Sequence, residues 1–546
     1  MRVRKVCLVK FLIYGFAAYG IFALVFVTYP TLDANSVSRG VRTFSVGKVL
    51  PISFSQYRIF ATNEASGVQR RAATKSNNSS GIFLPHAHKT SIDNKDKNNK
   101  TLTQDKGGMK NNSNALLSKT RTTYPANVTS FPTTPVPSSE ATTTTDFQQI
   151  QNNVSIYVYS AYYNDQKSPP VVTVIGVGLL KTLHRRISCR LLKTEYTNHG
   201  RAGGGGHVLN APRADTVTTN GIVVRMPDSH NLPYGAIFIH CAISSRMPRP
   251  HQVSLVVNRR LPPLSCLRVT YPDPAPPRWQ TALCLSPLHS NYSNWQQVIE
   301  TMELVKILGA DHVTAYVTSV SGNVRRVLQH YVTRTFMHVH MWRNPPQPVH
   351  YYGQIAAIND CLFRMRHASK LVVFTDLDEV IVPHVHGTWS AMLDSLRQRT
   401  NDSDHIAVFT FRNAFFYLSP PGPASNKTLI GHTDQVSTLL TAEQEEQARW
   451  LGLSSARRLY RTLYIWGDRD RSKMIVDPLR VAMVGIHYPH FLAKGYRAVI
   501  VHPNLALLHH YRQWSPQKTV RDISALRFAP RLIDSVKKTW WELGMK

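Results

Sequence analysis

Three acidic residues, Asp376, Asp378 and Glu379, follow an apolar run in the segment LVVFTDLDEVIVP, residues 371–383. Carboxylates are costly to bury, so acidic residues at the end of a buried strand need a partner. In an extended segment residues i and i+2 point the same way, so Asp376 and Asp378 should converge. Two carboxylates suit Mn²⁺ or Mg²⁺, which takes further ligands from water and substrate phosphates. The segment predicts a metal site for a diphosphate-linked substrate.

The segments before this cluster alternate between strand and helix patterns. Strand patterns occur in TALCLSPL (281–288), HVTAYVTSV (312–320), FMHVHMW (336–342) and LVVF (371–374). This alternation predicts an α/β fold with a parallel sheet and helical crossovers. Ligands bind such sheets beyond the carboxyl ends of the strands. The acidic cluster follows the fourth strand, so it should lie at that edge.

Three helix patterns separate these strands. In the first, Asn294 is a capping residue and Gly309 is placed to end the helix. The second is NVRRVLQHYV, residues 323–332. The apolar faces of the first and third helices consist of Val298, Met302, Val305 and Leu308, and of Ile355, Ile358, Leu362 and Met365.

The region before this series is rich in short β patterns, including VSIYVYSAYY, VVTVIGVGLL, GAIFIHCAI and HQVSLVVN. Turn-forming segments separate them, and no clear helical period intervenes before residue 270. We therefore expect a β-rich accessory domain at 153–270, built as a small sandwich, and a catalytic domain at 271–546.

The first 152 residues predict a membrane anchor and a stem. Basic residues in 1–10 precede an apolar run at 11–29, close to the roughly 20 residues a membrane helix needs. Positive charge on the N-terminal flank predicts a cytoplasmic tail and a type II, single-pass signal-anchor. A cleaved signal peptide is the alternative reading. Residues 30–152 are rich in Ser, Thr, Asn and Pro and carry several N-glycosylation sequons, which predicts a disordered, glycosylated stem.

Charge and cysteine content narrow the class of protein. Lys plus Arg is 64 and Asp plus Glu is 32, giving a net charge of +32, which suits an anionic partner. The basic residues are scattered and no nucleic-acid-binding motif is found, so no nucleic acid is expected. Five of the six cysteines follow the predicted anchor. At most two disulfides can form among them, and one thiol remains.

Two other classes of protein fit parts of the pattern. A hydrophobic strand followed by Asp-x-Asp also resembles the first motif of haloacid dehalogenase-like phosphatases, with Asp376 as nucleophile and Asp378 as general acid or base. That motif normally opens its domain, and the late acidic segment GDRDRSK (467–473) is poorly spaced. A non-catalytic, type II membrane glycan-binding protein is the other alternative, against which the grouped acids argue.

Several ordered stretches resemble glycosyltransferase family 92 over residues 154–512. The most specific is YGQIAAINDCLFRMRHASKLVVFTDLDEVIVP (352–383), accompanied by FTFRNAFFY, RSKMIVDPLRVAMVGIHYP and NLALLHHYR. The resemblance implies a Golgi type II membrane enzyme with a GT-A-like catalytic domain. It implies inverting transfer of galactose from UDP-galactose in β1,4 linkage, to acceptors such as a fucose of an N-glycan or galactan.

The resemblance also assigns roles to residues. Asp376 and Asp378 would hold the metal and the diphosphate, and a late histidine, His510, would complete the metal site. Lys473 and Arg512 would bind phosphate oxygens. Inversion needs a carboxylate that deprotonates the acceptor hydroxyl. Glu379 is the first candidate for this base, and Asp477 is the second.

Overall fold

The computed structural model describes residues 146–193, 216–343, 345–400, 402–418, 439–512 and 519–545. Near the N-terminus it describes only the backbone of two paired strands, β1 (Leu12–Gly15) and β2 (Phe22–Val25). Most of the predicted anchor, the predicted tail and nearly all of the predicted stem lie outside these ranges. No helix in the described ranges is long and apolar enough to cross a membrane. The chain divides into two compact units, Met1–Arg58 and Ile59–Lys546, and all elements described below belong to the second.

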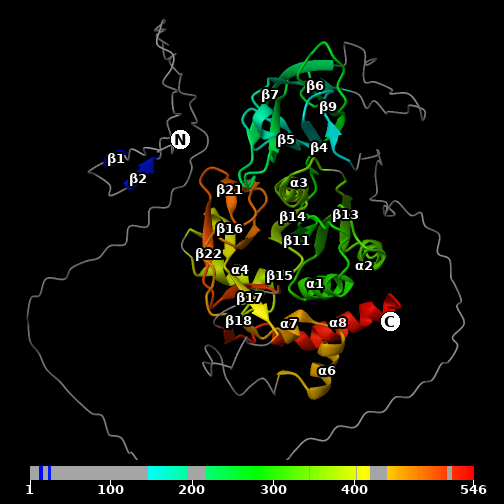
Figure 1. Ribbon diagram of the computed structural model, residues 1–546, viewed down its shortest axis with the longest axis vertical. Helices are drawn as coiled ribbons and strands as arrows, with labels where there is room; N and C mark the ends of the chain where they lie inside the picture. Colours follow the sequence, from blue (N-terminus) through cyan, green and yellow to red (C-terminus); the bar gives the residue numbers. More distant parts are fainter. Residues whose placement is uncertain are drawn as a thin grey trace, which may run out of the picture. The chain divides into compact units, whose positions relative to one another are not determined.

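The β-rich region folds into one sheet that closes on itself (Figure 1). The order is β10-β9-β6-β7-β8-β5-β4-β3, and β10 also pairs in parallel with β4. The predicted sandwich is therefore wrong: seven strands form a closed barrel, and β3 adds to β4. Closure removes the exposed edges of a sheet, but an alternating sequence pattern does not specify it. The strands are β3 (Gln148–Gln149), β4 (Ile156–Asn164), β5 (Val171–Leu179), β6 (Ile187–Leu192), β7 (Thr216–Arg225), β8 (Tyr234–Ala242), β9 (Gln252–Val256) and β10 (Leu267–Thr270).

A disulfide crosses one strand inside the barrel. Cys189 on β6 bonds to Cys241 on β8, and β7 lies between these two strands. Gly221 on β7 lies opposite Cys241, and a Cβ atom there would lie 3.0 Å from Cys189 Sγ. The glycine therefore leaves room for the disulfide.

The α/β region contains a seven-stranded sheet in the order β13-β12-β11-β14-β19-β16-β22. The four strands predicted from the sequence are parallel to one another, as expected, and β19 is antiparallel to its neighbours. Because β11 lies between β12 and β14, the strand order reverses there, which creates a topological switch point. The strands are β11 (Trp279–Leu285), β12 (His312–Val317), β13 (Met337–Met341), β14 (Ser369–Thr375), β16 (Ile406–Phe411), β19 (Lys473–Val476) and β22 (Arg497–Val501).

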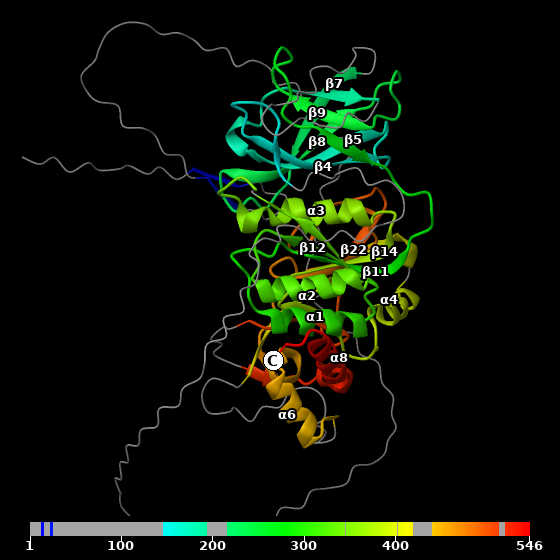
Figure 2. The same cartoon turned by 90° about the vertical axis from the view of Figure 1, so that its right-hand side faces the viewer.

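Helices cover both faces of this sheet (Figure 2). Helices α1 and α2 lie on one face, with α8 beyond them, and α3 lies on the other face beneath the barrel. The predicted start of α1 is confirmed, since Asn294 accepts a hydrogen bond from the Gln297 backbone N–H, and Gly309 has a left-handed φ of 98° just after its end. The helices are α1 (Trp295–Ile307), α2 (Gly322–Thr333), α3 (Gln354–Met365), α4 (Trp389–Gln398), α6 (Ala442–Trp450), α7 (Ser454–Arg457) and α8 (Ala529–Glu542).

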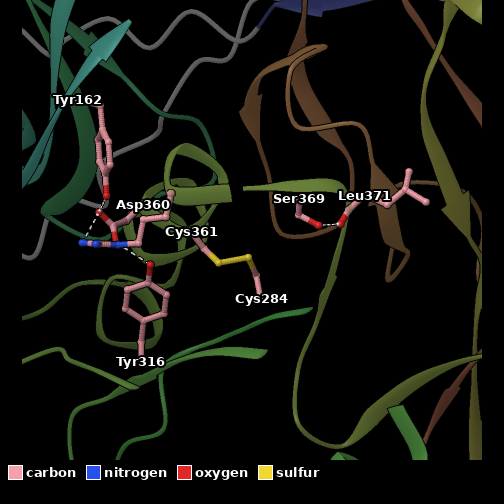
Figure 3. Close-up of a disulfide and its surroundings, with 8 residues drawn as sticks. Tyr162, Cys284, Tyr316, Asp360, Cys361, Ser369 and Leu371 are labelled. Carbon is pink, nitrogen blue, oxygen red and sulfur yellow. Dashed lines mark hydrogen bonds and ion pairs between the residues drawn. A yellow bond between two sulfur atoms is a disulfide. The ribbon is translucent and has the colours of Figure 1, made fainter. Parts of the chain in front are cut away.

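Helix α3 is fixed between the barrel and the sheet by a disulfide and a buried carboxylate (Figure 3). Cys361 on α3 bonds to Cys284 on β11. Asp360 is fully buried and contacts side chains of β4, β12 and α3 itself. Together with the disulfide in the barrel, this confirms the expected two disulfides, and Cys266 is the thiol that remains in the described region.

A second, five-stranded sheet has the order β15-β23-β17-β18-β24. The chain passes from β14 of the first sheet to β15 of the second through residues 376–378, so the acidic cluster lies at the junction of the two sheets. The strands are β15 (Glu379–Pro383), β17 (Asn413–Tyr417), β18 (Tyr460–Thr462), β23 (Ala506–His510) and β24 (Thr519–Arg521), and a hairpin of β20 (Val481–Val484) and β21 (Pro489–Leu492) is separate.

Candidate active site

Asp376 lies directly beyond the carboxyl end of β14, beside the switch point. Its Oδ1 atom accepts hydrogen bonds from the Ser286 hydroxyl, which follows β11, and from Gln354 Nε2 at 3.0 Å. Its Oδ2 atom accepts a hydrogen bond from Lys473 Nζ at 2.8 Å. Side chains from three elements thus hold this carboxylate at the edge where α/β sheets bind ligands.

Residues 376–378 form a turn in which the Glu379 N–H donates to the Asp376 carbonyl at 3.2 Å. The i, i+2 alternation of an extended strand does not apply to a turn, so the predicted reason for Asp376 and Asp378 to converge is wrong. Both carboxylates nevertheless remain accessible, because the side chains of Asp376 and Asp378 are each 33 % exposed. Each has its own set of partners, Lys473 for Asp376 and His510 for Asp378.

Beneath these exposed acids lies a buried ion-pair network. Lys473 and Glu379 are each 3 % exposed, and Lys473 Nζ lies 3.3 Å from Glu379 Oε2. The same Oε2 atom accepts a hydrogen bond from the Asp376 backbone N–H, while Oε1 lies 3.1 Å from His510 Nδ1. Both oxygens of Glu379 are therefore engaged by protein groups.

The network shifts the pKa values of its members in different directions. Burial raises the pKa of Asp376, but the Lys473 ammonium outweighs it and the pKa falls to about 2. Burial raises the pKa of Glu379 to about 6, against the opposing effect of Lys473. Burial disfavours the charged form of Lys473, but its two carboxylate partners raise its pKa well above the ordinary value. Asp376 and Lys473 are thus both charged at neutral pH.

His510 is held opposite Glu379 by the antiparallel pairing of β15 and β23. Its Nε2 atom lies 3.3 Å from Asp378 Oδ2. Burial lowers the pKa of His510, but Asp378 and Glu379 reverse this and the pKa lies above its ordinary value. The neighbouring His509 points to the other face of the strand, where its ring stacks on Phe416 at 3.8 Å. Strand alternation therefore directs only His510 toward the acids.

The donor set is compatible with a hard divalent cation, although no three His, Cys, Asp or Glu side chains in the described ranges are arranged as a preformed metal site. Asp376 and Asp378 offer accessible carboxylate oxygens of the kind Mn²⁺ and Mg²⁺ prefer. Histidines that bind metals commonly donate their second ring N–H to a carboxylate. The Nδ1 atom of His510 beside Glu379 fits this arrangement and leaves Nε2 facing Asp378.

The other predicted residues lie in different places. Arg512 is exposed two residues beyond His510, and its backbone N–H donates to the His510 carbonyl. Asp477 lies at the far edge of the sheet, because β19 runs antiparallel to β14 and pairs Val476 with Val372. There Asp477 pairs with Arg480 at 2.9 Å. Asp477 is therefore outside the site, and its assignment as the second candidate base is wrong.

Two residues that contact Asp376 were missed by the sequence reasoning. Ser286 follows β11 immediately, and Gln354 begins α3. A signal was available for Ser286, because a polar residue directly after a parallel strand belongs to the edge where ligands bind. Gln354 gave no comparable signal, since its contact with Asp376 depends on how α3 packs on the sheet.

Residues 280–543 match the model of the family described as Glycosyltransferase family 92. Over these residues, a little under half of the chain, the protein is therefore similar to glycosyltransferase family 92. One relative, a glycosyltransferase family 92 protein of Caenorhabditis elegans, is 24 % identical over 208 residues, which cover 36 % of this chain and 40 % of the relative. Another, the C. elegans beta-1,4-galactosyltransferase galt-1, is 26 % identical over 109 residues, 19 % of this chain and 26 % of the relative. The chain spans about two fifths of the length of the first two such relatives.

Solved structures with partial similarity include two transferases. Glucosyl-3-phosphoglycerate synthase from Mycobacterium tuberculosis, in complex with Mn²⁺, UDP and glucosyl-3-phosphoglycerate, is 11 % identical, covers 48 % of this chain and 80 % of its own, and has a TM-score of 0.22. Mannosyltransferase PcManGT from Pyrobaculum calidifontis, with GDP-Man and Mn²⁺, is 12 % identical, covers 50 % and 77 %, and has a TM-score of 0.23. Because these TM-scores are so low, we infer the fold from the sheet topology and not from these two structures.

Proposed function

We propose that the chain is a metal-dependent, inverting glycosyltransferase that moves a hexose from a nucleotide sugar to a glycan. One observation carries this proposal. Within the region that is similar to family 92, the Asp376 and Asp378 carboxylates are accessible at the carboxyl edge of the sheet, beside the switch point between β11 and β14. Ligands bind open α/β sheets beyond the carboxyl ends of the strands, and a divalent cation that carries a diphosphate there would need oxygen ligands.

We assign Asp376, Asp378 and His510 as the residues that would hold Mn²⁺ or Mg²⁺. A bound cation would neutralise the charge that develops on the diphosphate as it leaves. Lys473 is buried and paired with two carboxylates, so we propose that it keeps Asp376 ionised rather than contacting phosphate directly. Arg512 is exposed close to His510 and is the better candidate for a phosphate oxygen.

Glu379 is assigned a positioning role in this proposal. One of its oxygens pairs with Lys473 and the other with His510, and the side chain is 3 % exposed. To act as the base on an acceptor hydroxyl, Glu379 would have to break one of these contacts and gain access to solvent. We therefore propose that Glu379 orients His510 and Lys473, and we leave the base unassigned.

We further propose UDP-galactose as the donor, a β1,4 linkage, and a fucose of an N-glycan as the acceptor. Family resemblance supports this choice, as does the name of the relative galt-1, which matches 19 % of this chain. The basic composition, with a net charge of +32, suits a nucleotide diphosphate. The anchor predicted at 11–29 and the predicted sequon-rich stem support a place in the Golgi membrane with the catalytic domain in the lumen.

The test is a transfer assay on a secreted form of the chain. It should begin before Asp146, because Ile150 is fully buried and β3 pairs with β4. The protein is incubated with UDP-galactose and a fucose-bearing N-glycan, with Mn²⁺ or with a chelator, and the glycan mass is followed. We expect a gain of one hexose that requires metal.

If no hexose is transferred from UDP-galactose, the assay is repeated with other UDP-sugars. Failure to transfer any hexose, together with no metal-dependent binding of UDP, would overturn the proposal. Hydrolysis of phosphate esters through an aspartyl-phosphate at Asp376 would favour the phosphatase alternative. Glycan binding that survives Asp378→Asn, without any transfer, would favour the non-catalytic alternative.

A further inference from the structure

Five aromatic or imidazole rings from three separate segments form a continuous group beside the site. We call His230, His289, His350, Tyr351 and Tyr352 the ring platform. The His230 and His350 rings stack with centroids 3.6 Å apart, and His350 contacts Tyr351 at 4.6 Å. The His289 ring stacks on Tyr352 at 4.3 Å and lies 6.0 Å from Tyr351. The contacts thus run without a break from the first segment to the third.

The three segments come from different parts of the fold. His230 lies in the loop between β7 and β8, so it belongs to the barrel. His289 follows β11, and the remaining three rings form the short turn before α3. The barrel therefore contributes a side chain to a group that the α/β region builds.

The backbone of all three segments adopts the left-handed conformation at residues other than glycine. Positive φ values occur at Asp228, His230, Asn231, Ser290, Asn291, Tyr351 and Tyr352. The values for Tyr351 and Tyr352 are 37° and 55°. Such conformations are unfavourable for residues other than glycine and persist where surrounding structure enforces them, commonly at ligand sites. Their concentration in the three segments that meet here indicates a binding function.

The platform adjoins the acidic cluster. Ser286, three residues before His289, donates to Asp376, and so does Gln354, two residues after Tyr352. Burial and the neighbouring His230 lower the pKa of His350 to about 4, while Asp228 and Asp376 act in the opposite direction. His350 is therefore neutral at pH 7, which removes charge repulsion from its stack with His230.

The chemistry of the platform suits a neutral, hydroxyl-rich ring. The Tyr351 side chain is 54 % exposed and presents an aromatic surface. The segments 228–231, 289–291 and 350–352 contain no Lys or Arg, whereas they contain Asp228 and four short polar residues, Ser229, Asn231, Ser290 and Asn291. The Asp228 carboxylate, which pairs with His490 at 3.0 Å, would repel a diphosphate. Carboxylate, amide and hydroxyl groups are instead suitable partners for sugar hydroxyls.

We propose that the ring platform is the subsite for a neutral sugar ring of the acceptor glycan, and that the loop between β7 and β8 forms one wall of it. The barrel is then part of the active site rather than a separate accessory module. This inference rests on the proposed function, because it assumes that a glycan is the acceptor. It names the part of the site that binds the acceptor and separates it from the acidic cluster that binds the donor.

The test measures binding of two ligands by the secreted chain and its variants. Affinity for a fucose-bearing N-glycan and affinity for UDP with Mn²⁺ are determined by isothermal titration calorimetry. We expect Tyr351→Ala and His230→Ala each to weaken glycan binding by about five- to tenfold, the scale of a lost ring contact. UDP affinity should stay unchanged. Tyr351→Phe keeps the ring and should bind glycan nearly as well as the wild type.

Trp541→Ala is the matched control, since Trp541 is 85 % exposed on α8 and lies outside the platform. It should change neither affinity. Unfolding temperatures identify any variant that fails to fold. If Tyr351→Ala does not fold, His230→Ala still tests the inference, because His230 is exposed and its loss should not disturb the core.

Three outcomes would overturn the inference. The first is a loss of UDP affinity with glycan affinity unchanged, which would assign the platform to the nucleotide base. The second is no change in either affinity. The third is a wild-type chain that binds no neutral glycan from a panel of N-glycans. The proposed function fails separately, when the wild type transfers no hexose and shows no metal-dependent binding of UDP.

Discussion

Two carboxylates, Asp360 and Asp376, are both held by several hydrogen-bond donors, yet they differ in access to solvent. Asp360 is fully buried and accepts hydrogen bonds from Tyr162, Tyr316 and Arg364 at 2.6–2.7 Å. Ser160 is a fourth donor to Asp360. The Asp376 side chain has three side-chain donors, but it is 33 % exposed at the edge of the sheet. A carboxylate that protein donors enclose on every side is structural, whereas one fixed from beneath and open above can bind a ligand.

The enclosed carboxylate connects parts of the molecule that are far apart in the sequence. Tyr162 belongs to the barrel strand β4 and Tyr316 to β12 (Figure 3). Ser160 also lies on β4, and Arg364 lies on α3. Asp360 therefore joins the barrel to the sheet through α3. Because Gln354 begins the same helix, this connection also fixes one of the donors to Asp376.

The largest effect should come from Asp360→Asn. The substitution removes the charge of a fully buried carboxylate that pairs with the Arg364 guanidinium, whose side chain is 25 % exposed. We therefore expect a loss of about 3 kcal/mol in unfolding free energy. Urea denaturation followed by tryptophan fluorescence measures it. Asp394→Asn is the control, because the Asp394 side chain is 60 % exposed and should cost less than about 0.5 kcal/mol. A loss under about 1 kcal/mol for Asp360→Asn would contradict the structural role.

Asp378→Asn should reduce activity and leave stability nearly unchanged, in contrast to Asp360→Asn. The side chain is accessible, so stability should change little, while hexose transfer should fall by about 10²–10³-fold through loss of charge at the donor site. The initial rate of transfer from UDP-galactose measures it. Asp477→Asn is the matched control, since Asp477 lies at the other edge of the sheet and should leave the rate unchanged. Equal losses in both variants would contradict the assignment of the site.

Glu379→Gln should alter how stability depends on pH. The pKa of Glu379 is raised from 4.5 to about 6, so its stabilising contribution is present below pH 4.5 and is lost as pH rises through 6. Gln does not titrate, so the stability of the variant relative to the wild type should increase by about 2 kcal/mol from pH 4 to pH 7. Urea denaturation at several pH values measures this. A difference that stays constant with pH would show that the carboxyl titrates normally.

The smallest effects should come from removing one hydroxyl at each carboxylate. Ser286→Ala removes one donor to Asp376, but Gln354 still donates to the same oxygen, so transfer should fall by about five- to tenfold. Ser160→Ala removes one donor to Asp360 and should cost about 1–2 kcal/mol in stability without changing transfer. Assays of rate and unfolding on both variants measure the contrast. If Ser286→Ala and Ser160→Ala change transfer rate and unfolding free energy in the same way, the distinction between a ligand-binding and a structural carboxylate is contradicted.

Features that depend on local periodicity could be predicted from the sequence. The helix begun by Asn294, the four parallel strands and the position of the acidic cluster beyond the fourth strand all follow from patterns within short windows. Cysteine parity correctly limited the disulfides to two. These predictions held because hydrogen-bonding period and side-chain burial are set by neighbouring residues.

Which distant residues reach the acidic cluster depends instead on pairing between segments far apart in the chain. Lys473 is the first residue of β19, and Asp477 follows its last residue. Because β19 pairs with β14 in antiparallel orientation, Lys473 lies at the site and Asp477 lies at the opposite edge of the sheet. Closure of the barrel and the contact between Gln354 and Asp376 likewise depend on pairing between distant segments. Local propensity does not encode such pairing, because it is fixed by burial of surfaces that come together only in the folded chain.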